Sequence, residues 1–356
     1  MVRTAYVVVS PEDLFEFSKV ALTRAGVPEE DAAIVADALV AANLRGIDSH
    51  GVVRLYSYVE RIRRGLINPS AKPQVVRDFN AVALVDGNNG LGYVAAVYAS
   101  DIAVEKAKKY GVGVVGVRNS SHFGMAAYYG MRIAKRKMIG IVMSNAPPAM
   151  APWGGKVARL GTNPICMAFP SREEPIVLDM ALSVVARGKI RLAALKGEKI
   201  PEGWAFDEEG RPTTDPQAAL KGTLAPIGGP KGYGLAVAVD ILSGVLTGSA
   251  YSIYVKALDD YSGPSGTGFF VEAIDVQAFR PFEEYLEDLE NFVKIIKETP
   301  KASGVSEIYL PGEIEGNILK QRLRDGIPLD RETVELLKKT ALVLHLELPK
   351  FLSSQQ

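Results

Sequence analysis

Apolar side chains in the first part of the chain recur every three or four positions, the spacing that places them on one face of a helix. Leu14, Phe17 and Val20 follow this pattern. Ser10 and Pro11 precede them, and Ser is a favoured helix cap while Pro suits the first helical position. The same spacing predicts helices at 11–25, 29–46 and 52–64, so the chain is expected to begin with a helical region.

Short apolar runs beyond residue 73 are typical of strands, and they alternate with further helical patterns. The predicted strands are 75–76, 81–85, 112–117, 139–143, 165–169, 176–178, 269–271 and 307–310. The predicted helices are 93–110, 235–246 and 282–297, with two more beginning near 312 and 330. This alternation predicts an α/β protein. The runs at 201–216 and 257–267 are interpreted as loop insertions.

Charge is distributed unevenly along this chain. Residues 106–172 contain no Asp or Glu, although the whole chain has 41 in 356 residues and about eight would be expected in a block of this size. The same block holds eleven Lys and Arg. Removing carboxylates lowers the repulsion that an anionic ligand meets. We therefore expect a ligand with phosphate or carboxylate groups near this block; the alternative is that it consists mostly of core strands and glycine turns.

Overall composition excludes several classes of protein. The 41 basic and 41 acidic residues balance, which argues against a nucleic-acid surface. The single cysteine, Cys166, excludes a disulfide framework and a cysteine metal cluster, and no metal is expected. No apolar run reaches the roughly 18 residues that span a bilayer, and the first ten residues lack the order of a signal peptide. We expect a cytoplasmic protein without a membrane partner.

Residues 111–116, Gly-Val-Gly-Val-Val-Gly, match the GxGxxG dinucleotide fingerprint by letters only. The fingerprint works when it follows a strand and opens a helix, whose amino end meets the pyrophosphate. Here the predicted order is reversed, because a helix ends before Gly111 and the glycines lie within a strand. The acidic residue expected about 20 positions later is also missing. The sequence therefore disfavours a Rossmann fold.

A better phosphate candidate is Lys231, which stands among four glycines at 228–234 just before a predicted helix. Backbone amides, a helix amino end and an ammonium group then converge, which suits a phosphate oxygen. The alternative is a flexible turn ahead of a core helix.

Two of the three histidines lie in polar clusters. His50 belongs to Asp-Ser-His-Gly at 48–51, with Arg54 and Tyr58 four residues apart on one face of the following helix. His122 belongs to Asn-Ser-Ser-His-Phe-Gly at 119–124. An imidazole exchanges protons near neutral pH, and an arginine holds a carboxylate through two donors. Taken singly, each histidine is as well explained as a capping or core residue; His345, between leucines, is interpreted as structural.

These motifs together resemble the malate/L-lactate dehydrogenase family that lacks a Rossmann fold. That family also contains ureidoglycolate dehydrogenase, diketogulonate reductase, sulfolactate dehydrogenase and a cyclic-imine reductase. The matching segments are 48–51, 119–124, 161–164 (Gly-Thr-Asn-Pro), 178–181 (Leu-Asp-Met-Ala), 229–234 and 311–313 (Pro-Gly-Glu). They follow the family's order from about residue 10 to 345, whereas 252–268 fits the pattern least.

The resemblance implies an NAD- or NADP-dependent oxidoreductase that interconverts a 2-hydroxy acid and a 2-oxo acid. It implies a largely mixed or antiparallel central sheet flanked by helices. It also implies a substrate and dimerisation domain formed by 1–118 plus 305–356, and a cofactor-binding domain at 119–304. A homodimer is implied, with its active site near the subunit contact.

Particular residues carry these roles in the family. The implied cofactor residues are Ser144, Asp179, Met180, Ala181, Lys231, Pro311, Gly312 and Glu313. The implied substrate residues are Ser49, Arg54 and Tyr58, and the catalytic set is His50, His122 and Asp179. His50 starts a helix, whose positive end lowers the pKa of an imidazole, and Asp179 is the carboxylate predicted to offset this. We favour His50 as the proton-transferring group and His122 as the residue that orients the substrate oxygen.

Other interpretations stay open at this point. The same fold can act on ureidoglycolate, sulfolactate, diketogulonate or a cyclic imino acid instead of malate or L-lactate. A relative that binds nucleotides without catalysis is a further alternative, although both histidines, Arg54 and Lys231 are present. The sequence leaves open the preferred acid and the choice between NAD and NADP.

Overall fold

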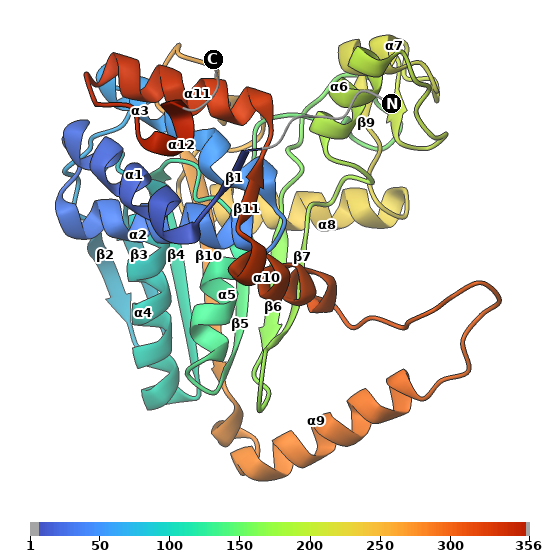
Figure 1. Ribbon diagram of the computed structural model, residues 1–356. Helices are drawn as coiled ribbons and strands as arrows, with labels where there is room; N and C mark the ends of the chain where they lie inside the picture. Colours follow the sequence, from blue (N-terminus) through green and yellow to red (C-terminus); the bar gives the residue numbers. More distant parts are fainter. Residues whose placement is uncertain (1–6, 354–356) are drawn as a thin grey trace.

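A seven-stranded sheet runs through the molecule (Figure 1). The structure is a computed structural model that describes residues 7–353. The strand order of the sheet is β2-β3-β4-β10-β5-β6-β7, and every neighbouring pair is antiparallel except β3–β4. The strands are β2 (Gln74–Phe79), β3 (Val82–Asp86), β4 (Val112–Ser120), β5 (Met138–Ser144), β6 (Ile165–Phe169), β7 (Ile176–Met180) and β10 (Thr267–Asp275). The predicted α/β class and the mixed, largely antiparallel sheet are confirmed.

Helices cover both faces of this sheet. α4 (Gly92–Tyr110) and α5 (Ala126–Ala134) pack together on one face, whereas α8 (Pro230–Asp240) and its π-helical continuation η3 (Ile241–Val245) contact β4, β5 and β10. Glycines allow these contacts. A Cβ on Gly113 would lie 2.0 Å from the carbonyl oxygen of Ala103 in α4, and one on Gly116 would lie 3.0 Å from the Thr247 methyl carbon. Gly113 and Gly116 thus serve helix packing inside a strand, whereas Gly111 ends α4 with a φ of 82°.

A helical layer with its own core lies at one end of the sheet. It contains α1 (Pro11–Arg24), α2 (Glu29–Leu44), α3 (Leu55–Arg63), α11 (Arg331–Val343) and α12 (Lys350–Ser353). The predicted helical start is confirmed, but the third helix is preceded by two 3-10 turns, η1 (Asp48–His50) and η2 (Val52–Arg54). β1 (Val7–Val9) pairs antiparallel with β11 (Ile327–Leu329), which joins the two ends of the chain.

A small lobe projects beside α8 (Figure 1). It contains α6 (Arg187–Lys196), α7 (Pro216–Lys221) and the two-residue strands β8 (Ala205–Phe206) and β9 (Thr223–Leu224). The run at 201–216, interpreted as a loop insertion, therefore contains one strand of a small hairpin. The domain division after residue 118 falls inside β4, so under that division both domains share the central sheet. No helix in residues 7–353 is long and apolar enough to cross a membrane.

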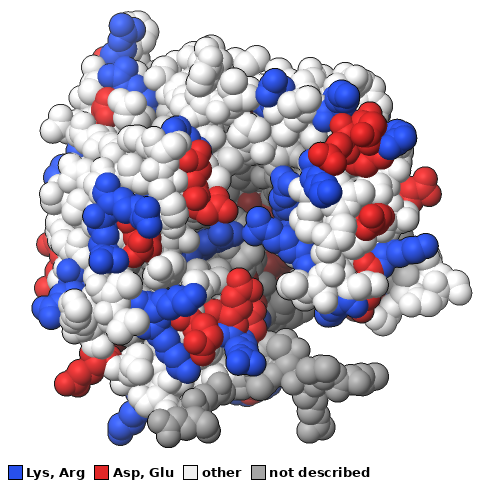
Figure 2. Space-filling view, turned by 90° about the horizontal axis from the view of Figure 1, so that it is seen from above, with Lys and Arg blue, Asp and Glu red and all other residues white. Residues whose placement is uncertain are grey.

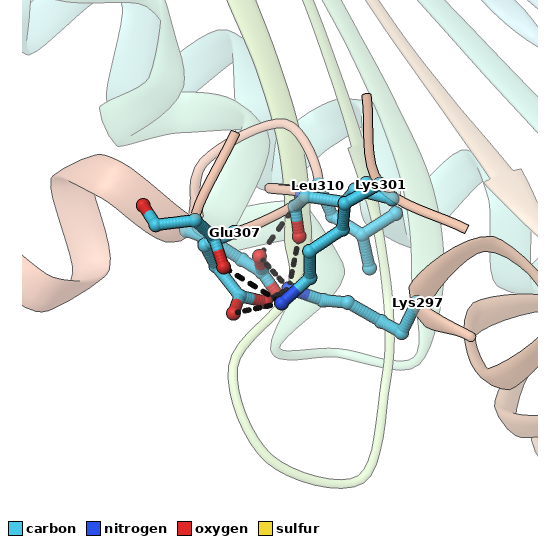
Figure 3. A network of polar contacts seen from close by, with 7 residues as sticks. Lys297, Lys301, Glu307 and Leu310 are labelled. Atoms are coloured by element: carbon cyan, nitrogen blue, oxygen red, sulfur yellow. Dashed lines mark hydrogen bonds and ion pairs between the residues drawn. The ribbon is translucent and has the colours of Figure 1, made fainter. Parts of the chain in front are cut away.

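An arm leaves the body after β10. It consists of a short 3-10 turn, η5 (Val276–Ala278), then α9 (Phe282–Lys297) and a long loop that returns to α10 (Glu313–Asp325) (Figure 1). The strand predicted at 307–310 is wrong, because this segment pairs with no strand in the described chain and runs as irregular backbone. Side chains anchor it instead. Lys297 Nζ donates to the Ile308 carbonyl at 2.6 Å and to the Glu313 carboxylate at 2.5 Å. Figure 3 shows Lys297 and Lys301 converging on Glu307, with which both form ion pairs.

Candidate active site

The turn that carries His50 follows the end of α2 and is fixed by one amide side chain. Asn43 Nδ2 donates to Asp48 Oδ1 at 2.6 Å, and Asn43 Oδ1 accepts the backbone N–H of Val52 at 2.9 Å. Gly51 lies directly against this amide, since a Cβ there would be 2.1 Å from Asn43 Oδ1. His50 is thereby held at the end of η1 as a half-buried residue whose imidazole Nδ1 lies 3.0 Å from Ser49 Oγ.

The loop that carries His122 follows β4 directly. Asn119 turns the backbone with a φ of 51°, and the buried Ser121 hydroxyl donates to the Gly90 carbonyl at 2.9 Å. This places the two imidazoles face to face. The rings of His50 and His122 have centroids 5.5 Å apart and planes inclined by 21°, although the residues lie far apart in the sequence.

Tyr58 connects α3 to the same site. Its fully buried hydroxyl lies 2.7 Å from His122 Nδ1 and 2.9 Å from the hydroxyl of Tyr93. Arg54 lies at the start of α3, where its Nε donates to the Ser49 carbonyl at 2.7 Å. The structure therefore brings together the three residues predicted to bind substrate and the two predicted catalytic histidines, and adds Tyr93. No sequence signal distinguished Tyr93, because its role depends on a contact with a residue 35 positions away.

The protonation of His122 follows from its neighbours. The backbone N–H of Gly124 donates to His122 Nδ1 at 3.3 Å, and a backbone N–H has no acceptor function. Nδ1 must therefore carry a lone pair, so Tyr58 O–H also donates to it. The neutral ring then holds its proton on Nε2, which makes Nε2 a hydrogen-bond donor.

Burial keeps both histidines neutral. Desolvation lowers the pKa of His50 to about 4, with a smaller contribution from the positive charge of Arg54. Desolvation also lowers the pKa of His122 well below its ordinary value; repulsion from a protonated His50 and from the positive charge of Arg54 acts in the same direction. The pKa of Tyr58 is raised, mainly by burial, so its hydroxyl stays protonated.

Asp179 does not have the predicted role beside His50. Its Oδ2 accepts the backbone N–H of Ala127 at 2.8 Å, at the amino end of α5. Burial raises its pKa to about 6, and the charge of Arg45 opposes that shift. The side chain whose charge acts on His50 is Arg54 rather than Asp179. The Asp179 carboxylate lies at this position because β7 is the edge strand beside α5, whose amino end attracts a negative charge.

A cavity of about 370 Å³ brings Asp179 together with two residues of the predicted cofactor loop, Pro311 and Gly312. The loop is fixed on β7 because Val177 N–H donates to the Pro311 carbonyl at 3.0 Å. Two charged residues that the sequence had not indicated, Arg45 and Glu315, also line the cavity. Glu313 does not line it; its carboxylate accepts from the Leu310 N–H and pairs with Lys297.

The remaining predicted cofactor residues lie outside that cavity lining. Lys231 is exposed in the first turn of α8 and makes no ion pair within the described chain. Ala181 is exposed at the end of β7, and the segment after it is joined to the loop before Lys231 by the Ile227–Leu182 backbone hydrogen bond of 3.0 Å. Met180 is half-buried against the core of the small lobe. The hydroxyl of Ser144 donates a hydrogen bond to the Asn145 carbonyl at 2.8 Å.

Basic side chains gather around an open hollow in the surface. Viewed from above, the molecule is hollowed between the helical layer and the lobe of α6 and α7, and Lys and Arg side chains lie within and beside the hollow (Figure 2). Asp and Glu side chains also lie along the rim (Figure 2), whereas the basic side chains within the hollow favour an anionic ligand there.

Known proteins resemble this chain over nearly its whole length. A family model described as malate/L-lactate dehydrogenase matches residues 9–338. A malate/(S)-sulfolactate dehydrogenase from Methanothermus fervidus is 44% identical over 96% of this chain and 99% of its own. The solved sulfolactate dehydrogenase from Methanocaldococcus jannaschii is 42% identical, with a TM-score of 0.91 over 96% of this chain and 98% of its own.

Relatives with either nicotinamide cofactor in their names also match. A (2R)-3-sulfolactate dehydrogenase (NADP(+)) from Chromohalobacter salexigens is 37% identical over 90% of this chain and 94% of its own. A ureidoglycolate dehydrogenase (NAD(+)) from Escherichia coli is 34% identical over 94% of this chain and 96% of its own. The chain belongs to the malate/L-lactate dehydrogenase family, and it is a dehydrogenase of that family.

Proposed function

We propose that the protein is an NAD- or NADP-dependent oxidoreductase that interconverts a 2-hydroxy acid and a 2-oxo acid, of the malate or L-lactate type. The observation that carries the proposal is the pair of stacked, neutral histidines beside an arginine. The names of the relatives at 44% and 42% identity support a substrate with a second anionic group, malate or sulfolactate. Sulfolactate is therefore the second candidate.

Arg54 is proposed to hold the substrate carboxylate. Its Nε is already bound to the Ser49 carbonyl, and its two terminal nitrogens form no hydrogen bond in the described chain. An arginine held at one nitrogen offers its other donors in a fixed orientation to a carboxylate. Arg54→Lys should weaken binding of the 2-oxo acid, because an ammonium keeps the charge but loses the planar arrangement. Unchanged kinetics in this variant would place the carboxylate elsewhere.

His122 is proposed to orient the substrate oxygen. Its Nε2–H is available as a donor, while its Nδ1 is held by Tyr58 and Gly124. It is a poor source of a proton, because the loss of its only N–H would leave an imidazolate unless Tyr58 supplied a proton to Nδ1. The raised pKa of Tyr58 opposes that transfer.

His50 is proposed to move the proton. As a neutral imidazole it can accept the hydroxyl proton when the 2-hydroxy acid is oxidised, and return it to the oxygen in the reverse reaction. A bound nicotinamide supplies the hydride chemistry.

The residues present suit a dinucleotide. The exposed ammonium of Lys231 lies in the first turn of α8, after Gly228 and Gly229 with φ of 56° and 64°. This is the environment that binds phosphate at a helix amino end. Asp179 and Glu315, in the cavity beside Pro311 and Gly312, offer acceptors for the hydroxyl groups of a ribose. Pro311 and Gly312 would form its wall.

A direct spectrophotometric assay of cofactor oxidation tests the proposal. NADH and NADPH oxidation is followed with oxaloacetate, pyruvate, sulfopyruvate and a cyclic imine as substrates. We expect turnover with at least one 2-oxo acid, and a loss of about 10²–10⁴ in kcat for His50→Asn. His122→Asn should act mainly on substrate KM. The assignment of the two histidines is reversed if His50→Asn keeps kcat within about tenfold while His122→Asn loses the larger factor. No turnover with any of these acids would refute the function.

We also propose that two copies associate through the outer face of α8 and η3. Leu235, Ile241, Val245 and Leu246 are all exposed there, with exposed fractions of 47% to 65%. Tyr251, Ile253 and Tyr254 extend the apolar surface in sequence. Monomeric proteins rarely expose apolar patches of this kind. Because the same helix carries Lys231, a copy bound here would lie beside the proposed cofactor site.

A further inference from the structure

The turn that carries His50 is held by an arginine far away in the sequence. Arg322, in α10, donates from Nη1 to Asp48 Oδ1 at 2.6 Å and from Nη2 to Asp48 Oδ2 at 3.0 Å. This two-point contact joins residues 274 positions apart. The arginine side chain is only 15% exposed, so the pair is partly shielded from water. Neither residue belongs to the sites assigned above.

Hydrogen bonds through Asn43 link this contact to the residues on both sides of His50. Arg322 Nη1 also donates to the carbonyl oxygen of Asn43 at 2.5 Å, and the Asn43 amide donates to Asp48 Oδ1. The other atom of that amide, Oδ1, accepts the N–H of Val52. Asp48 and Val52 bracket the tripeptide that contains His50. The guanidinium therefore fixes both ends of the turn, one directly and one through Asn43.

α10 lies along the whole segment that leads to this turn. Its start contacts Arg45, whose Nη2 donates to the Gly312 carbonyl at 3.4 Å. Farther along the same helix, Ile318 packs closely against Gly46. A Cβ on Gly46 would be 3.0 Å from the terminal carbon of Ile318. Arg322 makes the third contact, at Asp48. A segment held at three successive points on one helix has little freedom to move away from it.

We propose that Arg322 is a positioning residue for His50, acting through Asp48 and Asn43 rather than on the substrate. The proposal rests on the proposed function, because it takes His50 as the group that moves the proton. A catalytic imidazole that is displaced by about 1 Å loses a large part of its rate. Loss of Arg322 should therefore reduce turnover without removing any group that touches the substrate or the cofactor.

Steady-state kinetics test this with four variants and a control. Arg322→Gln and Asp48→Asn are each expected to lower kcat by tenfold or more, with the cofactor KM within twofold of the parent. The double variant should lose about as much as either single one, because both act on one contact. Arg322→Lys should recover part of the loss. Arg324→Gln is the control, since Arg324 is exposed on the same helix and pairs only with its neighbour Asp325; it should behave as the parent.

Two kinetic results would contradict the positioning role. A kcat within twofold of the parent in folded Arg322→Gln would overturn the proposal. So would a double variant whose loss is the product of the two single losses, because the residues would then act independently. If Arg322→Gln fails to fold, judged by circular dichroism, Arg322→Lys provides the same comparison with one donor retained.

A second measurement separates this proposal from the proposed function. The chain has three histidines, so ¹⁵N-labelled imidazoles give a simple spectrum. In the cofactor-free protein, Arg322→Gln should shift or broaden the His50 signals and leave those of His345 unchanged. Unchanged His50 signals would refute the positioning role. If the parent reduces no 2-oxo acid, the proposed function fails, while this spectrum still decides whether Arg322 holds His50.

Discussion

The two histidines differ in the hydrogen-bond partners of their Nδ1 atoms, and this difference supports the separate roles proposed for them. His122 Nδ1 accepts two hydrogen bonds from obligate or protonated donors, which directs its N–H outward on Nε2. Within residues 7–353, the partner of His50 Nδ1 is the Ser49 hydroxyl, which can donate or accept. His50 can therefore change its protonation without breaking a fixed hydrogen bond, whereas His122 cannot.

The pH dependence of the reaction should report the low pKa of His50. A pKa of about 4 lies below the ordinary value, so the ring is neutral and able to act as a base at every pH above about 5. We expect kcat/KM for oxidation of the hydroxy acid to stay level from pH 5.5 to 8. The reverse reaction needs the protonated ring, so its kcat/KM should fall by about tenfold per pH unit over the same range. Profiles that both bend near pH 6.5 would show that His50 has an ordinary pKa or does not transfer the proton.

Lys231 provides a test of the cofactor site at the same scale. Lys231→Ala should raise the cofactor KM by roughly tenfold or more, as expected for the loss of a charge-assisted contact of about 1.5–3 kcal/mol. Lys221→Ala is a suitable control. Lys221 is also exposed, but it ends the short helix α7 and does not stand at the amino end of a helix as Lys231 does. An unchanged KM for both NADH and NADPH would exclude a phosphate contact at Lys231.

At the level of elements, the sequence predicted what depends on local pattern. The strand at 165–169 and the helix at 282–297 match the structure residue for residue, because apolar spacing and turn residues mark both. The strand at 307–310 failed because a strand needs a partner, and that information is not local. α5 and α6 were not predicted. The face-to-face histidines were expected only as members of motifs; their contact depends on the path of the chain between them.

The acid-free block at 106–172 is better explained by the fold than by a ligand. β4, α5, β5 and β6 all lie within it, and β4 and β5 are interior strands of the sheet. Carboxylates are costly in such buried elements, so their absence needs no ligand. Of the site residues, the block contributes only His122 and Ser144. The proposed phosphate contact, Lys231, comes from outside it.

Gly113 should be essential for the contact between α4 and β4. Gly113→Ala places a Cβ 2.0 Å from a backbone oxygen, which cannot be relieved by a side-chain rotation. We expect a loss of about 1–3 kcal/mol in the free energy of unfolding, the usual cost of overpacking. Gly188→Ala is the matched control, because nothing lies within 4 Å of its Cβ position in α6; Ala there should be neutral or stabilising. Equal thermal midpoints for the two variants would contradict the packing argument.

On the scale of the whole molecule, the apolar face of α8 and η3 is exposed and has no packing partner among residues 7–353. Val245 and Leu246 are 55% and 65% exposed, and charging both should oppose any association through this face. We expect the parent to sediment at twice its 38.3 kDa chain mass, and Val245→Lys/Leu246→Lys to dissociate and lose activity in parallel. Leu195→Lys in α6 is the control, since Leu195 is 85% exposed on a different element and should leave the dimer intact. A parallel loss of the dimer and of activity is the informative result, because dissociation would uncover the helix that also carries Lys231. A parent that is fully active as a monomer at assay concentration would show that one chain completes the site alone.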